Sequence, residues 1–207
     1  MQRIWKKVKM ESTERNFTLS QHMTAYTTCV TATLQKLPVA ELEKVVLRLN
    51  EARTKRQRVF TCGNGGSAAT SIHFAADLEK GAMANGHHII DSECLCDNMA
   101  RFSAWANDTS FAEVFVGAIK SKISQGSVLI AISGSGNSPN VLHAVQTARS
   151  LGATTIGLTG FDGGRLKDLV DICVIVPSCS MEQIEDVHLL LCHLITSCLR
   201  NLAAVDL

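Results

Sequence analysis

The sequence predicts an α/β fold: one domain built on a parallel β-sheet. Apolar, mostly β-branched runs alternate with segments of helical periodicity, and these runs are too continuous to leave one face of each strand in water. The chain has 207 residues, of which 46% are hydrophobic. That length and composition fit one sizeable core with an added helical arm better than they fit two domains.

Five apolar runs are the expected strands, at residues 58–62, 88–91, 127–132, 154–159 and 171–176. Helices are expected between them, at residues 68–78, 97–106, 111–122 and 139–150. The last of these has Pro139 near its first turn and Gly152 just past its end, and both placements are typical of helix boundaries. The alternation predicts helices on both faces of the sheet.

Both ends of the chain depart from this alternation. Residues 1–19 are expected to be a flexible extension, and residues 20–207 one domain that includes a helical arm over residues 20–53, divided at Pro38. The segment from Ile184 to Leu202 is apolar over more than one stripe, so its helix should be buried on two sides. The wide apolar face and the arm favour a homo-oligomer.

Composition and charge limit the classes of partner and the cellular compartment that the protein is expected to have. The net charge is +1 and no basic stripe is present, so nothing favours nucleic acid or a membrane surface as a partner. No apolar run approaches the ~20 residues of a membrane helix, which predicts a cytoplasmic protein. The eight cysteines are scattered through core-like runs, as in a reducing compartment. Cys94 and Cys96 form a C-x-C pair, for which buried thiols are favoured over a metal site.

Two Ser/Gly-rich loops predict a phosphate site. Cys62–Ser67 and Ser133–Ser138 each follow a predicted strand and open a predicted helix. Such loops bring unpaired backbone N–H groups, hydroxyls and a helix N-terminus to one point. The serines could instead serve only as helix caps.

A dinucleotide site is an alternative for the first loop. Residues 63–68 fit the G-x-G-x-x-G/A pattern, and Asp91 stands at the end of the next predicted strand, where a ribose-binding carboxylate would be. The spacing to Asp91 exceeds the ~20 residues expected, and a nicotinamide enzyme gives no reason for the second loop. A Walker A loop is excluded because neither loop contains G-K-[ST].

Candidate acid–base and metal-binding side chains occur on two predicted helices. His73 and Asp77 stand at i and i+4, so they share a face, although such a pair without context is more often an exposed ion pair. Glu185, His188 and His193 lie on the C-terminal helix, where spacing alone favours Glu185 with His188 as a pair.

The two loops, together with Thr159-Gly160, Asp162-Gly163-Gly164 and Asn107-Asp108, resemble the sugar isomerase (SIS) domain family, specifically its phosphoheptose isomerase branch. The resemblance spans residues 20–202. It implies a three-layer, flavodoxin-like fold with a five-stranded parallel sheet. It also implies a homotetramer assembled through terminal helices, with the active site near a subunit interface.

The resemblance implies an intramolecular isomerase that converts sedoheptulose 7-phosphate to D-glycero-D-manno-heptose 7-phosphate through an enediol. A base, an acid and a group that polarises the carbonyl are then required. The alternative within the family is a non-catalytic adaptor that binds a phosphosugar or a replication initiator. Four potential metal ligands in this sequence argue against the adaptor.

The resemblance also assigns residues. The phosphate-binding positions are Ser67, Ser133, Gly134, Ser135 and Ser138, and the substrate-contacting positions are Asn64, Gly65 and Asp108. The positions that bind a divalent metal, usually Zn²⁺, are His73, Asp77, Glu185 and His193, a chemically reasonable zinc set. Proton transfer falls to Asp77 or Glu185 with His193, and His188 is expected on the polar face or behind the ligands. Relatives carry glutamate at the position of Asp77 and glutamine at that of Glu185.

Overall fold

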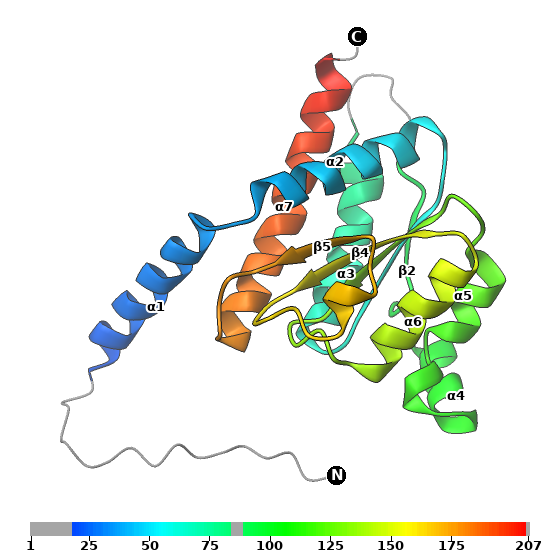
Figure 1. Ribbon diagram of the computed structural model, residues 1–207, viewed down its shortest axis with the longest axis horizontal. Coiled ribbons are helices and arrows are strands. Elements are labelled where there is room, and N and C mark those ends of the chain that lie inside the picture. The colour runs from blue at the N-terminus through cyan, green and yellow to red at the C-terminus, as the bar shows by residue number, and fades with distance from the viewer. Residues whose placement is uncertain (1–17, 84–88, 206–207) are drawn as a thin grey trace.

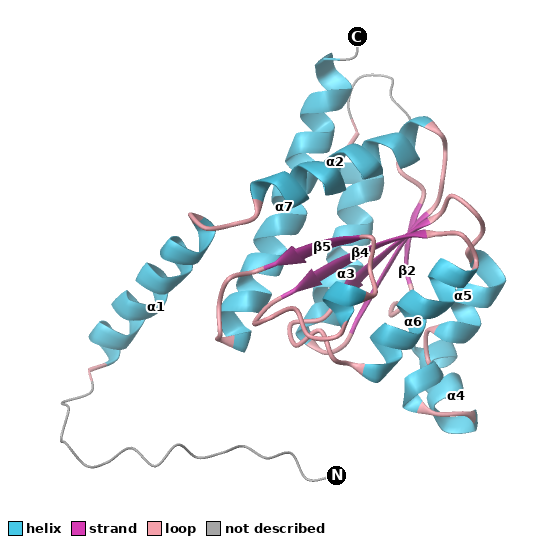
Figure 2. Ribbon diagram, in the orientation of Figure 1, coloured by secondary structure: helices cyan, strands magenta, loops and turns pink. Residues whose placement is uncertain are grey.

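A computed structural model describes residues 18–83 and 89–205 of the chain. Its centre is a five-stranded, all-parallel sheet with the strand order β2-β1-β3-β4-β5 (Figures 1 and 2). The predicted fold class is therefore confirmed. The strands are β1 (Val59–Gly63), β2 (Ser92–Cys94), β3 (Val128–Ile132), β4 (Thr154–Thr159) and β5 (Ile172–Ile175).

Seven α-helices and three short helical turns connect and flank the strands of the described chain. The α-helices are α1 (Leu19–Leu34), α2 (Val39–Thr54), α3 (Gly66–Ala76), α4 (Met99–Asp108), α5 (Val116–Lys122), α6 (Pro139–Ser150) and α7 (Met181–Val205). A π-helical turn, η1 (Asp77–Gly81), continues α3. The 3-10 turns are η2 (Phe111–Glu113) and η3 (Leu166–Asp168).

Helices cover both faces of the sheet, as the continuous apolar runs predict. Alternate residues of β3 divide between two cores. Val128, Ile130 and Ile132 pack with α2, α3 and α7 on one face. Leu129 and Ala131 pack with α5 and α6 on the other. The sheet is thus the middle of three layers.

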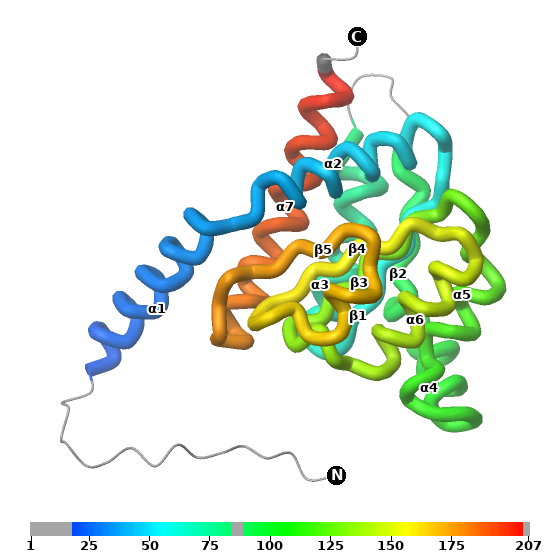
Figure 3. The backbone as a smooth tube through the Cα atoms, in the orientation of Figure 1, coloured from blue at the N-terminus to red at the C-terminus, as the bar shows by residue number. Residues whose placement is uncertain are grey.

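The chain order places the two Ser/Gly-rich loops side by side. β1 pairs with β2 on one side and with β3 on the other (Figure 3). The chain therefore leaves β1 toward one edge of the sheet and, after β2, returns to the opposite side of β1. Gly63 at the end of β1 lies opposite Ile132 at the end of β3. Ligands of open α/β sheets bind in the crevice at such a switch point, outside the carboxyl ends of the strands.

The helix over residues 139–150 and the strand over residues 154–159 have the predicted bounds, but other elements differ. The strand expected at residues 88–91 is wrong: residue 88 lies outside the described residues, and β2 begins at Ser92, opposite Val59. Only residues 92–94 come into register with β1, so the apolar Ile89 and Ile90 precede the strand. The helix expected over residues 111–122 is divided into η2 and α5.

The arm and the C-terminal helix lie outside the strand–helix alternation. α1 projects from the body of the fold (Figure 1) and exposes Leu19 and Met23, and Pro38 separates it from α2 as predicted. The stretch Met181–Ala204 is long and apolar enough to cross a membrane, contrary to the expectation that no run approaches this length. Much of it is buried against α2, α3 and the sheet, as in the core helix of a globular domain.

Candidate functional site

A cavity of about 120 Å³ lies between the first turns of α3 and α6 and the start of α7. A space of this size admits a group such as a phosphate. Most of the predicted substrate positions line it. Its walls are Asn64, Ser67, Ile132, Ser133, Gly134, Ser135, Ser138, Met181 and Glu185.

The serines of the cavity do not cap the helices beside them. Ser138 is the N-cap residue of α6, but its side chain makes no capping hydrogen bond. Its hydroxyl lies 3.5 Å from that of Ser133. The N-cap of α3 is Gly65, which has no side chain and takes a φ of +56°. The hydroxyls and the helix N-termini therefore face the same space, and together they can hold an anion.

A buried amide pair supports the first loop. The side chains of Asn64 and Asn140 exchange two hydrogen bonds of 2.8 Å, each amide donating to the oxygen of the other. Asn140 is fully buried in the first turn of α6. Asn64 thus faces Asn140 as well as the cavity. Asn140 is not among the residues predicted from the sequence, where its only signal is an amide directly after Pro139.

Three of the four predicted metal-binding residues converge beside this cavity. His73 Nε2 lies 3.1 Å from His193 Nε2 and 3.3 Å from Asp77 Oδ2. His193 Nε2 lies 3.7 Å from the same carboxylate oxygen. The ligand atoms of the three residues all lie within 4.8 Å of one another, and both histidines are about half exposed. Two imidazoles and a carboxylate are a donor set that Zn²⁺ accepts in open sites.

The π-helical turn positions Asp77 in this group. α3 widens into η1 at Asp77, and π turns inside α-helices often occur at functional sites. Gly81 ends the turn against α7, where a Cβ would come within 2.9 Å of Thr196 Cγ2. The Arg200 guanidinium also donates to the Gly81 carbonyl at 2.6 Å. Sequence periodicity could not show this widening, because it depends on contact with α7.

The fourth predicted ligand, Glu185, lies apart from this group. Its carboxylate covers Gly66 at the first turn of α3, where a Cβ would come within 2.5 Å of Oε2. The contacts of Gly66 with Glu185 and of His73 with His193 follow the same order in both helices, so α3 and α7 run parallel. Six residues separate Ser67 from His73, which is about 9 Å along a helix.

His188 is not on a polar face, so the first of the two positions expected for it is wrong. It is 1% exposed, and its Nε2 lies 3.2 Å from the carbonyl oxygen of Thr159, to which it donates. Desolvation by burial lowers the pKa of His188 to about 4. It is therefore neutral near pH 7, with Nδ1 buried and without a hydrogen-bond partner. No hydrogen bond therefore joins His188 to Glu185.

Two acidic residues lie away from the cavity. Asp108, an expected substrate contact, is exposed at the end of α4 and is not among the lining residues. Asp91 precedes β2 and contacts Arg58 at 3.0 Å. Because Ser92 pairs with Val59 at the start of β1, Asp91 lies at the amino edge of the sheet. It cannot meet a nucleotide bound at Gly63, so the geometry does not support the dinucleotide alternative.

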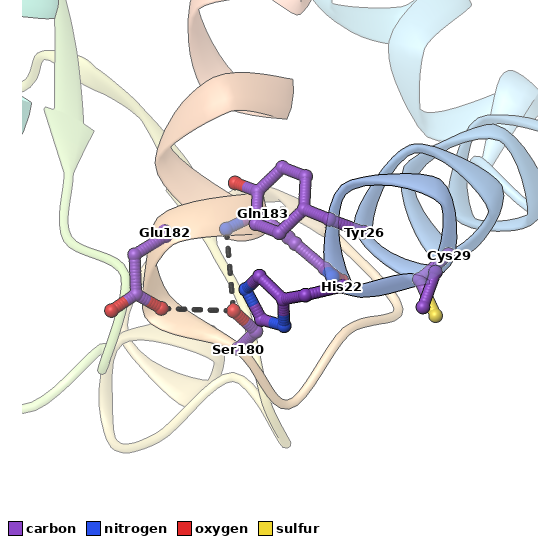
Figure 4. A pocket seen from close by; sticks show the side chains of 7 residues that line it. His22, Tyr26, Cys29, Ser180, Glu182 and Gln183 are labelled. Atoms are coloured by element: carbon purple, nitrogen blue, oxygen red, sulfur yellow. Dashed lines mark hydrogen bonds between the residues drawn. The ribbon is translucent and has the colours of Figure 1, made fainter. Parts of the chain in front are cut away.

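A larger cavity, of about 480 Å³, lies between α1 and the start of α7 (Figure 4). Its polar side chains come from both elements, and the Ser180 hydroxyl donates to Glu182 Oε2 at 2.9 Å. Nearby, Tyr26 donates to Asp186 at 2.5 Å, which raises the pKa of Tyr26 to about 12. The converging His and Asp side chains are not among its lining residues.

Comparison with known proteins agrees with this architecture. The family model described as SIS domain matches residues 24–160. A phosphoheptose isomerase of Aliarcobacter butzleri is 37% identical over 172 residues, which cover 83% of this chain and 88% of that protein. The chain belongs to the SIS domain family, in its phosphoheptose isomerase branch.

Other members give the same result. A phosphoheptose isomerase of Mycobacterium tuberculosis is 42% identical over 144 residues, covering 67% of this chain and 70% of that protein. The structure of phosphoheptose isomerase GmhA from Neisseria gonorrhoeae superposes with a TM-score of 0.82 at 29% identity, over 89% of this chain and all of that one. The resemblance stated from the loops is confirmed.

Proposed function

We propose that the protein is an aldose–ketose isomerase that converts sedoheptulose 7-phosphate to D-glycero-D-manno-heptose 7-phosphate. The observation that carries the proposal is the pairing of an anion-sized cavity with a His/Asp/His group on the same two helices. The relatives named phosphoheptose isomerase support the choice of substrate.

The separation of the anion-sized cavity from the His/Asp/His group matches the length of the substrate. An extended chain covers about 1.2 Å per bond, as in a polypeptide whose three backbone bonds span ~3.6 Å. The eight bonds from C1 of a heptose to its 7-phosphate phosphorus then span about 10 Å. With the phosphate against Ser67 and Ser133, the carbonyl end reaches the level of His73, about 9 Å along α3.

The proposed phosphate contacts are the hydroxyls of Ser67, Ser133, Ser135 and Ser138 and the backbone of Gly65 and Gly134. Their N–H and O–H groups donate to the anion, and the N-termini of α3 and α6 add favourable partial charge. Asn64 contacts the sugar from the cavity wall. We retain Asp108 as a substrate contact weaker than Asn64. The contact is weaker because Asp108 is exposed at the end of α4 and does not line the cavity.

Isomerisation moves a proton between C1 and C2 through an enediol. We assign the proton transfer to Asp77 as base and His193 as acid, because both belong to the group at the carbonyl end of the extended substrate. Glu185 is the second candidate for the base. Its position over Gly66 places it nearer the phosphate end.

We propose that Zn²⁺ is held by His73, Asp77 and His193, with Glu185 as a candidate fourth ligand. When bound, a divalent metal supplies a Lewis acid for the carbonyl oxygen. His73 then acts only as a ligand, while Asp77 and His193 also carry the proton transfer. The two imidazoles already converge on one carboxylate oxygen, which supports this assignment.

We further propose a cytoplasmic homotetramer with its active site near a subunit interface. One chain leaves both imidazoles about half exposed, and the nearby Leu190 and Leu194 of α7 are exposed as well. An apolar groove of about 700 Å³ runs between α2 and α7. A second subunit covering these surfaces would exclude water from the carbonyl end of the substrate. The domain assignment of residues 20–207 belongs to the same proposal.

The test is turnover of sedoheptulose 7-phosphate by metal-analysed protein, followed by NMR, with a chelator and with added zinc. We expect activity that the chelator abolishes and zinc restores. His193→Ala should lose turnover and zinc, whereas His143→Ala, at a half-buried position of α6 beside Glu113, should lose neither. No turnover by metal-replete, folded protein would contradict the proposal and favour the adaptor.

A further inference from the structure

Three cysteines lie at the edge of the sheet where the phosphate cavity opens. Cys62 is in β1, Cys94 ends β2, and Cys96 follows it by two residues. Cys62 and Cys94 are buried, and Cys96 is partly exposed. β1 and β2 are paired in parallel, with Thr61 opposite Cys94. These thiols therefore lie beside Gly63, the last residue of β1 before the first phosphate loop.

Cys96 binds the backbone of that residue. Its Sγ accepts a hydrogen bond from Gly63 N at 3.4 Å and donates to Gly63 O at 3.2 Å. On its other side, Gly63 has no room: a Cβ would lie 2.7 Å from the Ser67 carbonyl oxygen and 2.9 Å from that of Ile132. Ser67 and Ile132 both line the cavity. Gly63 is thus held between the Cys96 sulfur and the cavity wall.

Cys96 is also in contact with Cys94. The Cys96 N–H donates to Cys94 Sγ at 3.4 Å. A hydrogen bond from the Cys96 thiol lowers the pKa of Cys94, while the same pairing and burial raise the pKa of Cys96. The single Cys96 proton can serve either Cys94 or Gly63 O at one time. The lowered pKa favours the thiolate of Cys94, which is the reactive form of the side chain.

These thiols are not arranged as a metal centre. Among the described residues, the His/Cys/Asp/Glu group whose ligand atoms converge is His73, Asp77 and His193, and it includes no cysteine. Cys94 and Cys96 are instead two neighbouring free thiols in contact, with Cys96 partly exposed and placed to act as the resolving partner.

We propose that Cys94 and Cys96 are a reversible oxidation site, whose disulfide loosens Gly63 and weakens phosphate binding. The oxidant is a hydroperoxide, for which hydrogen peroxide serves as the probe. The Cys94 sulfur attacks one peroxide oxygen, the O–O bond breaks, and the leaving hydroxide takes a proton to become water. The Cys96 sulfur then displaces the hydroxyl from Cys94 and loses its proton, so that a second water leaves. Two thiols and one peroxide give one disulfide and two waters.

The disulfide acts on the loop by removing a donor. Cys96 in a disulfide has no S–H, so Gly63 O loses its hydrogen bond, and Sγ is drawn toward Cys94. Because Gly63 is packed against Ser67 and Ile132, a shift of its backbone must move the cavity wall. The expected effect is weaker binding of the phosphate group, and its consequence for turnover rests on the proposed function.

The experiment treats the full-length protein with hydrogen peroxide, quenches with catalase, alkylates free thiols and analyses the peptide that contains residues 94–96. We expect a mass lower by two hydrogens, no alkylation of this pair, and reversal by dithiothreitol. Oxidation should weaken inorganic phosphate binding at least threefold in calorimetry. The proposal is overturned if both thiols alkylate after treatment, or if the disulfide forms and phosphate affinity is unchanged.

Matched variants test whether Cys96 is responsible for the effect of peroxide on phosphate binding. Cys96→Ser keeps a hydroxyl that can donate to Gly63 O, so it should bind phosphate as the reduced protein does but become insensitive to peroxide. Cys29→Ser, at an exposed position of α1, should respond as the unaltered protein does. A peroxide response that persists in Cys96→Ser would contradict the assignment. The mass and phosphate measurements need no turnover, so failure of the isomerase proposal would remain distinguishable.

Discussion

The carboxylate of Glu185 lies over the backbone of Gly66, so that a Cβ on Gly66 would come within 2.5 Å of Oε2. Gly66 is the first residue of α3, and Glu185 also lines the cavity proposed for phosphate. A carboxylate benefits from a helix N-terminus. It also repels a phosphate that approaches the same N–H groups.

Glu185→Gln should therefore strengthen substrate binding. Removing one negative charge beside the bound phosphate should improve the binding free energy by on the order of 1 kcal/mol at a partly exposed site. We expect the KM for sedoheptulose 7-phosphate to fall threefold to tenfold, with kcat within tenfold of the unaltered enzyme. Glu182→Gln, at the arm cavity, is the matched control and should change neither constant. A kcat reduced a hundredfold or more would instead identify Glu185 as the base.

Gly81→Ala should disturb the metal-binding group through α7. The added methyl would lie 2.9 Å from Thr196 Cγ2, and Thr196 is buried. Overpacking of this kind costs about 1–3 kcal/mol. We expect the free energy of unfolding, measured in urea, to fall by that amount and zinc affinity to weaken.

The double variant Gly81→Ala/Thr196→Ser provides the control. Serine removes Cγ2 but keeps the hydroxyl that donates to the Cys192 carbonyl at 2.8 Å. It should recover most of the lost stability and zinc affinity. If the second substitution recovers nothing, the contact between η1 and α7 does not explain the effect.

His188 should make the protein sensitive to acid. Burial lowers its pKa from 6.5 to about 4. Between these values the unfolded chain binds a proton that the folded chain does not, so stability decreases as pH falls from about 6.5 to about 4. The loss is about 1.4 kcal/mol for each unit of pKa difference, and below pH 4 this residue adds no further loss.

The measurement is the free energy of unfolding against pH for the unaltered protein and for His188→Gln. Glutamine keeps a donor for the Thr159 carbonyl but does not titrate in this range. We expect the variant to show a shallower decline between pH 6.5 and 4. Equal slopes in the two proteins would show that His188 does not carry the effect.

Sequence patterns predict the sheet well because its strands are buried on both faces. β1, β3, β4 and β5 lie within one residue of their expected bounds. Apolar patterning does not predict the position of β2, because β2 is a short edge strand. Its polar residues are held in place by pairing with β1 and by ion pairs. Glu93, for example, contacts Arg58 at 3.2 Å and Arg101 at 3.4 Å.

Some residues of the candidate site could likewise be predicted from the sequence, and others could not. The serine loops could be found from local chemistry, and the His73/Asp77 pair from helical spacing. The buried state of His188 and the pairing of Asn140 could not, because each depends on a neighbour far along the chain. The Nε2 of His188 meets β4, 29 residues away, and Asn140 meets Asn64, 76 residues away.

Asn140 offers a direct test of whether the two phosphate loops act together. Its amide joins the loop after β1 to the first turn of α6 through two 2.8 Å hydrogen bonds, and its oxygen also accepts from Val141 N at 3.0 Å. Asn140→Ala leaves the Asn64 amide and a buried backbone N–H without these partners, which costs about 1–3 kcal/mol. We expect a raised KM for the phosphosugar together with reduced stability.

A double-mutant cycle separates the pair from its surroundings. Asn64→Ala, Asn140→Ala and the double variant are compared by urea unfolding and by phosphate affinity. Because the amides bind each other, we expect a coupling free energy of about 0.5–3 kcal/mol in stability and a smaller one of the same sign in phosphate binding. Additive effects in both measurements would mean that each loop holds its own part of the anion site, and that the amide pair only fills the space between them.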